Sequence, residues 1–247
     1  MSSIPPAILV RDGFTGDKTI LVLGAWRGGT SMLAEVLIEL GIFMGEKESF
    51  GWANAERTKS NFEDSDFDKI LFNPFLYEYL KTGNEPSPAE FDAKLPELER
   101  LVMSRNQRGT WGWKHPSTAL WCVRSMLLMR LRYPHIISIW RDPIAIWQHE
   151  MLPECHEDWL QKDIAKASSD GKSLAPDRSL AYVARQTRLL EESLLLRQYP
   201  QLVISYERCV CGGARSAVNS IIEFLKLNPC PEAIDAAIRV IIKRNGT

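Results

Sequence analysis

The sequence has few cysteines and no excess of charge of either sign. Its five cysteines form an odd set without a Cys-x-x-Cys pair, which argues against a disulfide framework and a structural zinc site: Cys122, Cys155, Cys209, Cys211 and Cys230. We expect free thiols. Lys plus Arg (30) nearly balances Asp plus Glu (31), so the basic field typical of nucleic-acid or membrane-surface binding is missing. Any anionic ligand must therefore be held by a local site.

Long hydrophobic runs are also missing. No apolar stretch approaches the roughly 20 residues needed to span a bilayer. The first residues, Met1-Ser-Ser-Ile-Pro-Pro, lack the basic start and apolar run of a secretory signal. We expect a cytoplasmic protein with no membrane span and no nucleic-acid partner. The length of 247 residues suits a single domain over 1–247, and the oligomeric state stays open.

Short apolar runs alternate with stretches of helical periodicity along the chain. Strands are expected at 19–23, 111–114, 135–140 and 202–206, and helices at 31–40, 117–132, 143–152, 177–199, 214–227 and 231–244. Residues 46–106 are looser and predict a helical insertion with helices at 66–81 and 87–105, and 161–177 predicts a loop. The alternation predicts an α/β fold, a parallel sheet with helices on both faces.

A glycine-rich loop joins the first predicted strand to the first predicted helix. Gly24-Ala-Trp-Arg-Gly-Gly-Thr-Ser31 has the spacing of a nucleotide-binding P-loop, except that Thr30 stands where the lysine should be. Consecutive glycines let backbone N–H groups turn toward an anion, and a helix N-terminus adds partial positive charge. The pattern predicts a phosphate site, with a simple tight turn as the bland alternative.

The cations around this loop do not suit an ATP or GTP enzyme. Such an enzyme needs the loop lysine and an acid at another strand end to help hold magnesium. Here Arg27 is the loop cation, and the strand at 135–140 is followed by Arg141 before Asp142. We therefore expect an anion site that requires no metal. A P-loop nucleotide kinase with a displaced cation, or a nonenzymatic nucleotide-binding protein of the same fold, is the alternative.

The sequence resembles the sulfotransferases that use 3′-phosphoadenosine 5′-phosphosulfate (PAPS), particularly the bacterial type whose first loop reads like Arg-Ser-Gly-Thr-Ser. Arg27-Gly-Gly-Thr-Ser31 matches that loop. Four further segments match family elements in the family's order: Asn61-Phe-Glu-Asp64, Trp111-Gly-Trp-Lys-His-Pro116, Trp140-Arg-Asp-Pro143 and Ser205-Tyr-Glu207. The resemblance covers residues 19 to about 227 and implies a P-loop-type fold and PAPS as sulfuryl donor.

This resemblance also implies roles for residues of the nucleotide site. It places the 5′-phosphosulfate at the loop, against Arg27, Gly28, Gly29, Thr30 and Ser31. It places the 3′-phosphate at Arg141, whose planar guanidinium can donate hydrogen bonds to two phosphate oxygens. His149 stands where the family usually has a serine that contacts the same phosphate, and is otherwise a helix-surface histidine. Tyr206 matches a tyrosine that can approach the adenine, or is a core residue at a strand end.

Sulfuryl transfer needs cations near the moving group and a base for an alcohol acceptor. Arg27 and Lys114 are the candidate cations, although Lys114 can instead simply cap an apolar strand. His115 and Glu35 compete as the base. Histidine has the pKa suited to neutral pH, whereas Glu35 matches the catalytic glutamate of the trehalose sulfotransferase type. We favour His115, with Glu63 as a third option. The acceptor is expected to be a small molecule.

Overall fold

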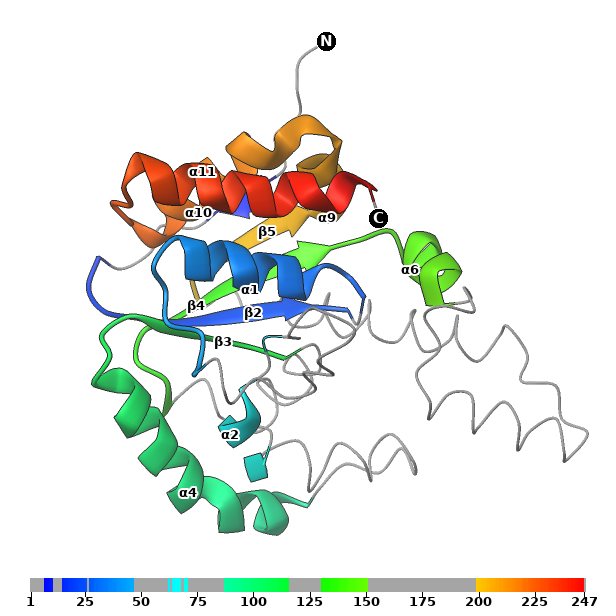
Figure 1. Cartoon of the computed structure of the whole chain (residues 1–247). Helices are drawn as coiled ribbons and strands as arrows, with labels where there is room; N and C mark the ends of the chain where they lie inside the picture. The colour runs from blue at the N-terminus through cyan, green and yellow to red at the C-terminus, as the bar shows by residue number, and fades with distance from the viewer. Residues whose placement is uncertain are drawn as a thin grey trace, which may run out of the picture.

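A computed structural model of the chain describes residues 7–10, 15–25, 27–46, 62, 64–67, 69–70, 87–115, 130–150 and 199–246. Its centre is a five-stranded sheet in the order β1-β5-β4-β2-β3 (Figure 1). The strands are β1 (Ala7–Val10), β2 (Thr19–Gly24), β3 (Trp111–Lys114), β4 (Pro134–Trp140) and β5 (Gln201–Ser205).

Four of the strands are parallel, as the alternation of strands and helices predicts. β2 pairs in parallel with β3 and with β4, and β4 pairs in parallel with β5. The edge strand β1 runs antiparallel to β5 and was not predicted, because four residues are too few to show a period. The predicted strand 202–206 lies one residue earlier in the structure, since Tyr206 already begins a short helix.

Helices cover both faces of the sheet, which confirms the predicted α/β class. On one face lie α1 (Thr30–Glu39), α10 (Ala214–Leu225) and α11 (Pro231–Ile242), and on the other lie α2 (Ser65–Phe67) and α4 (Pro88–Asn106) (Figure 1). Each face of the sheet has its own hydrophobic core, and successive side chains of β2 point to opposite faces. Ile20 and Val22 pack in the core with α1, α10 and α11, whereas Leu21 and Leu23 pack in the core with α2 and α4.

The ends of the two best-marked helices follow their sequence signals. α1 ends in a Schellman motif, in which Gly41 at φ 86° donates to Ile38 and Ile42 donates to Leu37. α4 begins with a capping box, in which Glu90 donates its N–H to the Ser87 side chain and Ser87 donates its N–H to the Glu90 carboxylate. These ends agree within one residue with the predicted ranges 31–40 and 87–105, although the capping box itself was not predicted.

The remaining described elements are short. They are α6 (Pro143–Glu150), α9 (Tyr206–Arg208), η5 (Cys209–Gly213) and η6 (Lys243–Gly246). The predicted helix 177–199, the loop 161–177 and residues 151–152 lie outside the described residues, except for residue 199. Most of the predicted helices 66–81 and 117–132 also lies outside them. The described cysteines, Cys209, Cys211 and Cys230, are free thiols as expected.

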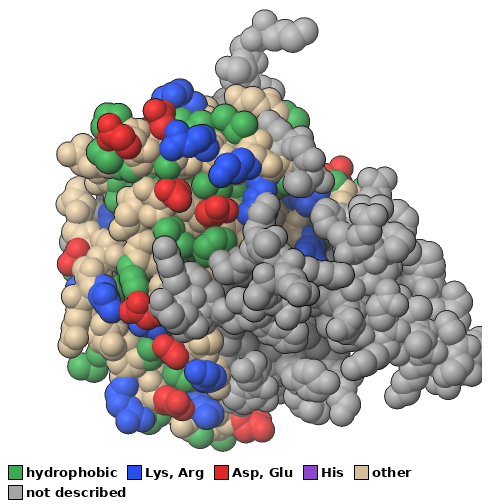
Figure 2. All heavy atoms as spheres, viewed as in Figure 1, with side chains coloured by type: hydrophobic (Ala, Val, Ile, Leu, Met, Phe, Trp, Pro, Cys, Tyr) green, Lys and Arg blue, Asp and Glu red, His purple; other side chains and the backbone are tan. Residues whose placement is uncertain are grey.

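The surface of the described residues carries no single-sign field on the face that Figure 2 shows. Acidic and basic side chains are interspersed there over the helices above and below the sheet. This agrees with the near balance of charges in the sequence. Within the described ranges, no helix has both the length and the apolar character needed to cross a membrane.

Candidate functional site

The predicted site lies where two neighbouring parallel strands end. β2 and β4 are adjacent, and the chain leaves β2 toward β3 on one side but leaves β4 toward β5 on the other. Ligands of open α/β sheets bind at such a divergence, beyond the carboxyl ends of the strands. The arrowheads of β2 and β4 in Figure 1 point to this edge, where α6 begins.

The loop from Gly24 to Thr30 turns tightly at this edge. The N–H of Gly28 donates to the carbonyl of Ala25 at 2.9 Å, and Arg27 adopts a left-handed φ of 60°. Gly29, at φ 99°, is the N-cap of α1, and no side chain caps the helix there. The first N–H groups of α1 have no partners within the helix. The loop thus has the backbone arrangement of an anion site.

Arg141 and Tyr206 close around this loop. Nη1 of Arg141 donates to the carbonyl oxygen of Arg27 at 2.9 Å, and the guanidinium lies 4.6 Å from the ring centroid of Tyr206. The same ring approaches the loop, because a Cβ added to Gly29 would lie 2.5 Å from its Cδ2 atom. Three sequence segments that the family resemblance assigns to one nucleotide site, at 24–31, 140–143 and 205–207, therefore lie in contact.

Glu207 ties the ends of β4 and β5 together. Its carboxylate accepts the backbone N–H of Asp142 at 2.8 Å and the hydroxyl of Ser205 at 3.3 Å. Asp142 in turn accepts the N–H of Ile144 at 2.8 Å and so caps α6. Sequence reasoning gave Glu207 no role, although its place after Tyr206 in a matching segment was a usable signal. Asp142 serves the helix end.

Lys114 is the last residue of β3, the neighbour of β2 on the other side, and His115 follows it directly. Lys114 pairs in register with Val22, two residues before the loop begins, and its side chain is 1% exposed. His115 is 4% exposed. Burial, and then the nearby Lys114, keep the pKa of His115 well below its usual 6.5. His115 is therefore neutral at pH 7.

The other predicted residues are placed as follows. Glu35 forms an ion pair with Arg244 at 3.1 Å, with 32% of its side chain exposed. His149 lies near the end of α6, and its backbone alone is described. Glu63 and Trp26 lie outside the described residues. No group of three or more His, Cys, Asp or Glu side chains within the described ranges is arranged to hold a metal.

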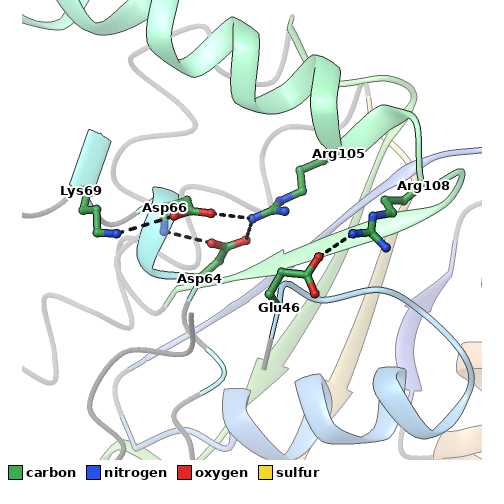
Figure 3. A network of polar contacts seen from close by, with 6 residues as sticks. All are labelled: Glu46, Asp64, Asp66, Lys69, Arg105 and Arg108. Carbon is green, nitrogen blue, oxygen red and sulfur yellow. Dashed lines mark hydrogen bonds and ion pairs between the residues drawn. The ribbon is translucent and has the colours of Figure 1, made fainter. Parts of the chain in front are cut away.

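A buried ion pair anchors the segment that contains the matching Asn61-Phe-Glu-Asp64. Arg105 at the end of α4 donates to Asp64 at 2.8 Å and to Asp66 at 3.0 Å (Figure 3). Burial raises the pKa of the Asp64 carboxyl, and Arg105 acts in the opposite direction. An exposed pair, Arg108 with Glu46 at 2.6 Å, lies beside it. Asp64 is thus a structural anchor, which the sequence did not reveal.

Comparison with known proteins finds similar structures but no similar sequence. No family model and no curated protein matches the sequence. A sulfotransferase domain from the curacin biosynthetic pathway is similar over 91% of this chain and 78% of its own, with a TM-score of 0.47 and 15% identity. Retinol dehydratase, solved with retinol and PAP, is similar over 92% and 65%, with a TM-score of 0.43 and 15% identity.

Sulfotransferase STF1 from Mycobacterium tuberculosis is similar over 93% of this chain and 76% of its own, with a TM-score of 0.42 and 13% identity. Each of these three likenesses covers more than nine tenths of this chain, and two of the three proteins are sulfotransferases by name. At these identities the likeness concerns the path of the backbone and not the chemistry of the site.

Proposed function

We propose that this chain is a PAPS-dependent sulfotransferase that transfers a sulfuryl group to a hydroxyl or amine of a small acceptor, such as a carbohydrate, a lipid headgroup or a metabolite. The observation that carries the proposal is the placement of Arg141. Its guanidinium is held beside the glycine loop, at a strand end where an ATP or GTP enzyme would have a metal-holding acid. The following acid, Asp142, caps α6.

The residues at this edge fit the two anionic ends of PAPS. A Cβ at Gly28 would lie 2.7 Å from the carbonyl oxygen of Ala25, and a Cβ at Gly29 would lie 2.5 Å from the ring of Tyr206, so the tight loop leaves no room for side chains at these two positions. We assign the 5′-phosphosulfate to this loop, with Arg27, Thr30 and Ser31. We assign the 3′-phosphate to Arg141, with His149 as a second contact.

The loop that follows β2 and the last residue of β3 would supply the charge stabilisation. When bound, PAPS supplies a sulfuryl group that passes from its 5′-phosphate to the acceptor, leaving PAP. Arg27 and Lys114 are assigned to the negative charge on the sulfuryl oxygens and on the departing phosphate. A buried ammonium such as that of Lys114 acts strongly on such charge, because little water screens it.

His115 is our first candidate for the base that takes the proton of the acceptor. Its low pKa keeps the ring neutral at pH 7, and it follows Lys114 directly. Glu35, which is engaged with Arg244, is the second candidate. We assign the acceptor pocket to the region 46–106, of which α2 and α4 are described.

Calorimetric titration of the protein with PAP, ADP and ATP in the absence of magnesium tests the proposal. Recognition of a 3′-phosphate predicts tight binding of PAP and feeble binding of ADP and ATP. Stronger binding of ADP or ATP than of PAP would refute it and would favour a kinase.

A pair of variants sharpens this titration. Arg141→Met should weaken PAP roughly 10- to 100-fold, because charged hydrogen bonds to the phosphate are lost, and should leave ADP unchanged. Arg208→Met is the matched control, since it removes the same charge from an exposed position on the adjoining α9. Equal losses of PAP affinity in both variants would mean that Arg141 contributes only its positive charge and makes no direct hydrogen bonds to the 3′-phosphate.

A further inference from the structure

Arg141 can discriminate between ligands only if its guanidinium is already in place. A free arginine side chain carries about 2 kcal/mol of rotamer entropy, and immobilising it on binding would reduce affinity by that cost. Arg141 follows β4 directly, in a stretch without helix or strand structure between Trp140 and Pro143. Its position must therefore be fixed by contacts from other elements.

Tyr206 holds the side chain of Arg141. The guanidinium lies over the ring at 4.6 Å from its centroid, a cation–π distance. Nη1 also donates to the carbonyl of Arg27, which uses one of the five N–H donors of the guanidinium; the structure records no partner for the other four among the described residues. These two contacts thus fix the position of the Arg141 side chain.

Glu207, the next residue, holds the backbone beside Arg141. Its carboxylate accepts the N–H of Asp142, and Ser205 donates its hydroxyl to the same carboxylate. Ser205 also caps α9, because it accepts the N–H of Arg208 at 3.4 Å. Two consecutive residues in the first turn of α9 therefore fix the side chain and the main chain at Arg141.

The ring of Tyr206 also packs against the glycine loop. A Cβ at Gly29 would lie 2.5 Å from Cδ2 and 3.0 Å from Cε2 of the ring, so loop and ring are in direct contact. The face of the ring that Arg141 covers is closed to a stacked adenine. These contacts favour a role for Tyr206 that is exercised through Arg141, and not the adenine contact that the family resemblance implies.

We propose that Tyr206 and Glu207 are positioning residues that hold Arg141 for the 3′-phosphate, so that selection of a 3′-phosphorylated nucleotide depends on α9. This inference rests on the proposed function. It predicts that the protein prefers PAP over adenosine 5′-phosphate (AMP), which lacks the 3′-phosphate. This preference would depend on Tyr206 and Glu207, although neither residue needs to touch the ligand.

Calorimetry with PAP and AMP on wild type, Tyr206→Phe and Tyr206→Leu provides the test. Tyr206→Phe keeps the ring face and should keep the affinity for PAP. Tyr206→Leu should weaken PAP roughly 10-fold, the size of a partly desolvated cation–π contact, and leave AMP unchanged. An equal loss for PAP and AMP would show an adenine contact and overturn the inference, as would no loss for either.

A double-mutant cycle removes the remaining ambiguity. Once Arg141 is replaced by Met, adding Tyr206→Leu should not change the ratio of PAP to AMP affinity further, because the two residues act as one unit. An additive effect would overturn the inference. Glu207→Gln weakens the acceptor for the Asp142 N–H and should also reduce the ratio, which keeps the proposal testable if Tyr206→Leu does not fold.

Failure of the proposed function gives a different result. If the wild-type protein binds PAP no more tightly than AMP, there is no 3′-phosphate preference and the sulfotransferase proposal itself fails. If the wild type prefers PAP and the preference survives both Tyr206→Leu and Glu207→Gln, the positioning role alone is wrong.

Discussion

Glu35 on α1 and Arg244 near the C-terminus form an ion pair with 3.1 Å between Oε2 and Nη2, across 209 residues of sequence. The pair joins the helix that follows the glycine loop to η6, which continues α11. Glu35 thus has a structural partner, whatever its part in catalysis.

Removing this pair should have a small effect on stability. Glu35→Gln and Arg244→Met are each expected to lower the free energy of unfolding by about 1 kcal/mol or less, because both side chains are partly exposed and screened. Urea unfolding of the two single variants and the double variant measures it. A double variant no less stable than either single variant would show that the pair accounts for the whole effect.

Replacing the base should remove turnover and spare binding. We expect His115→Gln to lower kcat by about 100-fold or more with little change in PAP affinity, and Glu35→Gln to lower kcat only a few-fold. Wild-type activity should be lost only as the pH falls well below 6.5, because the pKa of His115 is depressed and the base acts unprotonated. A large loss in Glu35→Gln alone would reassign the base, and unchanged turnover in both variants would exclude both residues.

Two glycines at positive φ, Gly29 and Gly41, distinguish the effect of backbone strain from that of a lost contact. Gly29→Ala puts a Cβ 2.5 Å from Tyr206, so the ring must move and PAP affinity should fall at least 10-fold, by the loss of a cation–π contact. Gly41→Ala, also at positive φ, meets nothing within 4 Å and should cost about 1 kcal/mol of stability without changing PAP affinity. Equal PAP affinities for the two variants would contradict the contact.

Two neighbouring ion pairs should differ greatly in their contribution to stability. Asp64→Asn is expected to destabilise the protein by about 1.5–3 kcal/mol, because the buried Arg105 would keep only Asp66 as a carboxylate partner. Glu46→Gln, in the exposed pair with Arg108, should cost less than about 1 kcal/mol. Urea unfolding of both variants at one pH gives the comparison. Similar costs would mean that Asp64 is not the anchor of its segment.

Stability should fall as the pH is lowered through 6.5. Burial lowers the pKa of His135, with Lys18 adding to the effect and the hydrogen bond to the Tyr133 carbonyl opposing it. In the unfolded chain His135 therefore binds a proton near pH 6.5, whereas in the folded protein it stays neutral until the pH is lower. The stability that is present above this pH is lost below it. His135→Gln should make the dependence of the urea midpoint on pH shallower than in the wild type. An identical dependence would contradict it.

The sequence alone was sufficient for the parallel sheet and for the loop. Strand and helix periods are local properties, and so are the glycine spacing before Thr30 and the caps at Ser87 and Gly41. The antiparallel edge strand β1 was missed, because its pairing with β5 is set by tertiary contact and not by any period in its four residues.

The partners of the site residues were decided by the tertiary structure. The contact of Arg141 with Tyr206, the acceptance of the Asp142 N–H by Glu207 and the pairing of Glu35 with Arg244 join residues from 65 to 209 positions apart. The first two contacts depend on which strand ends become neighbours in the sheet, and the third depends on the packing of α11 against α1. Strand order and helix packing are properties of the folded chain. The sequence determined which residue types carry the chemistry, and the fold determined what each of them contacts.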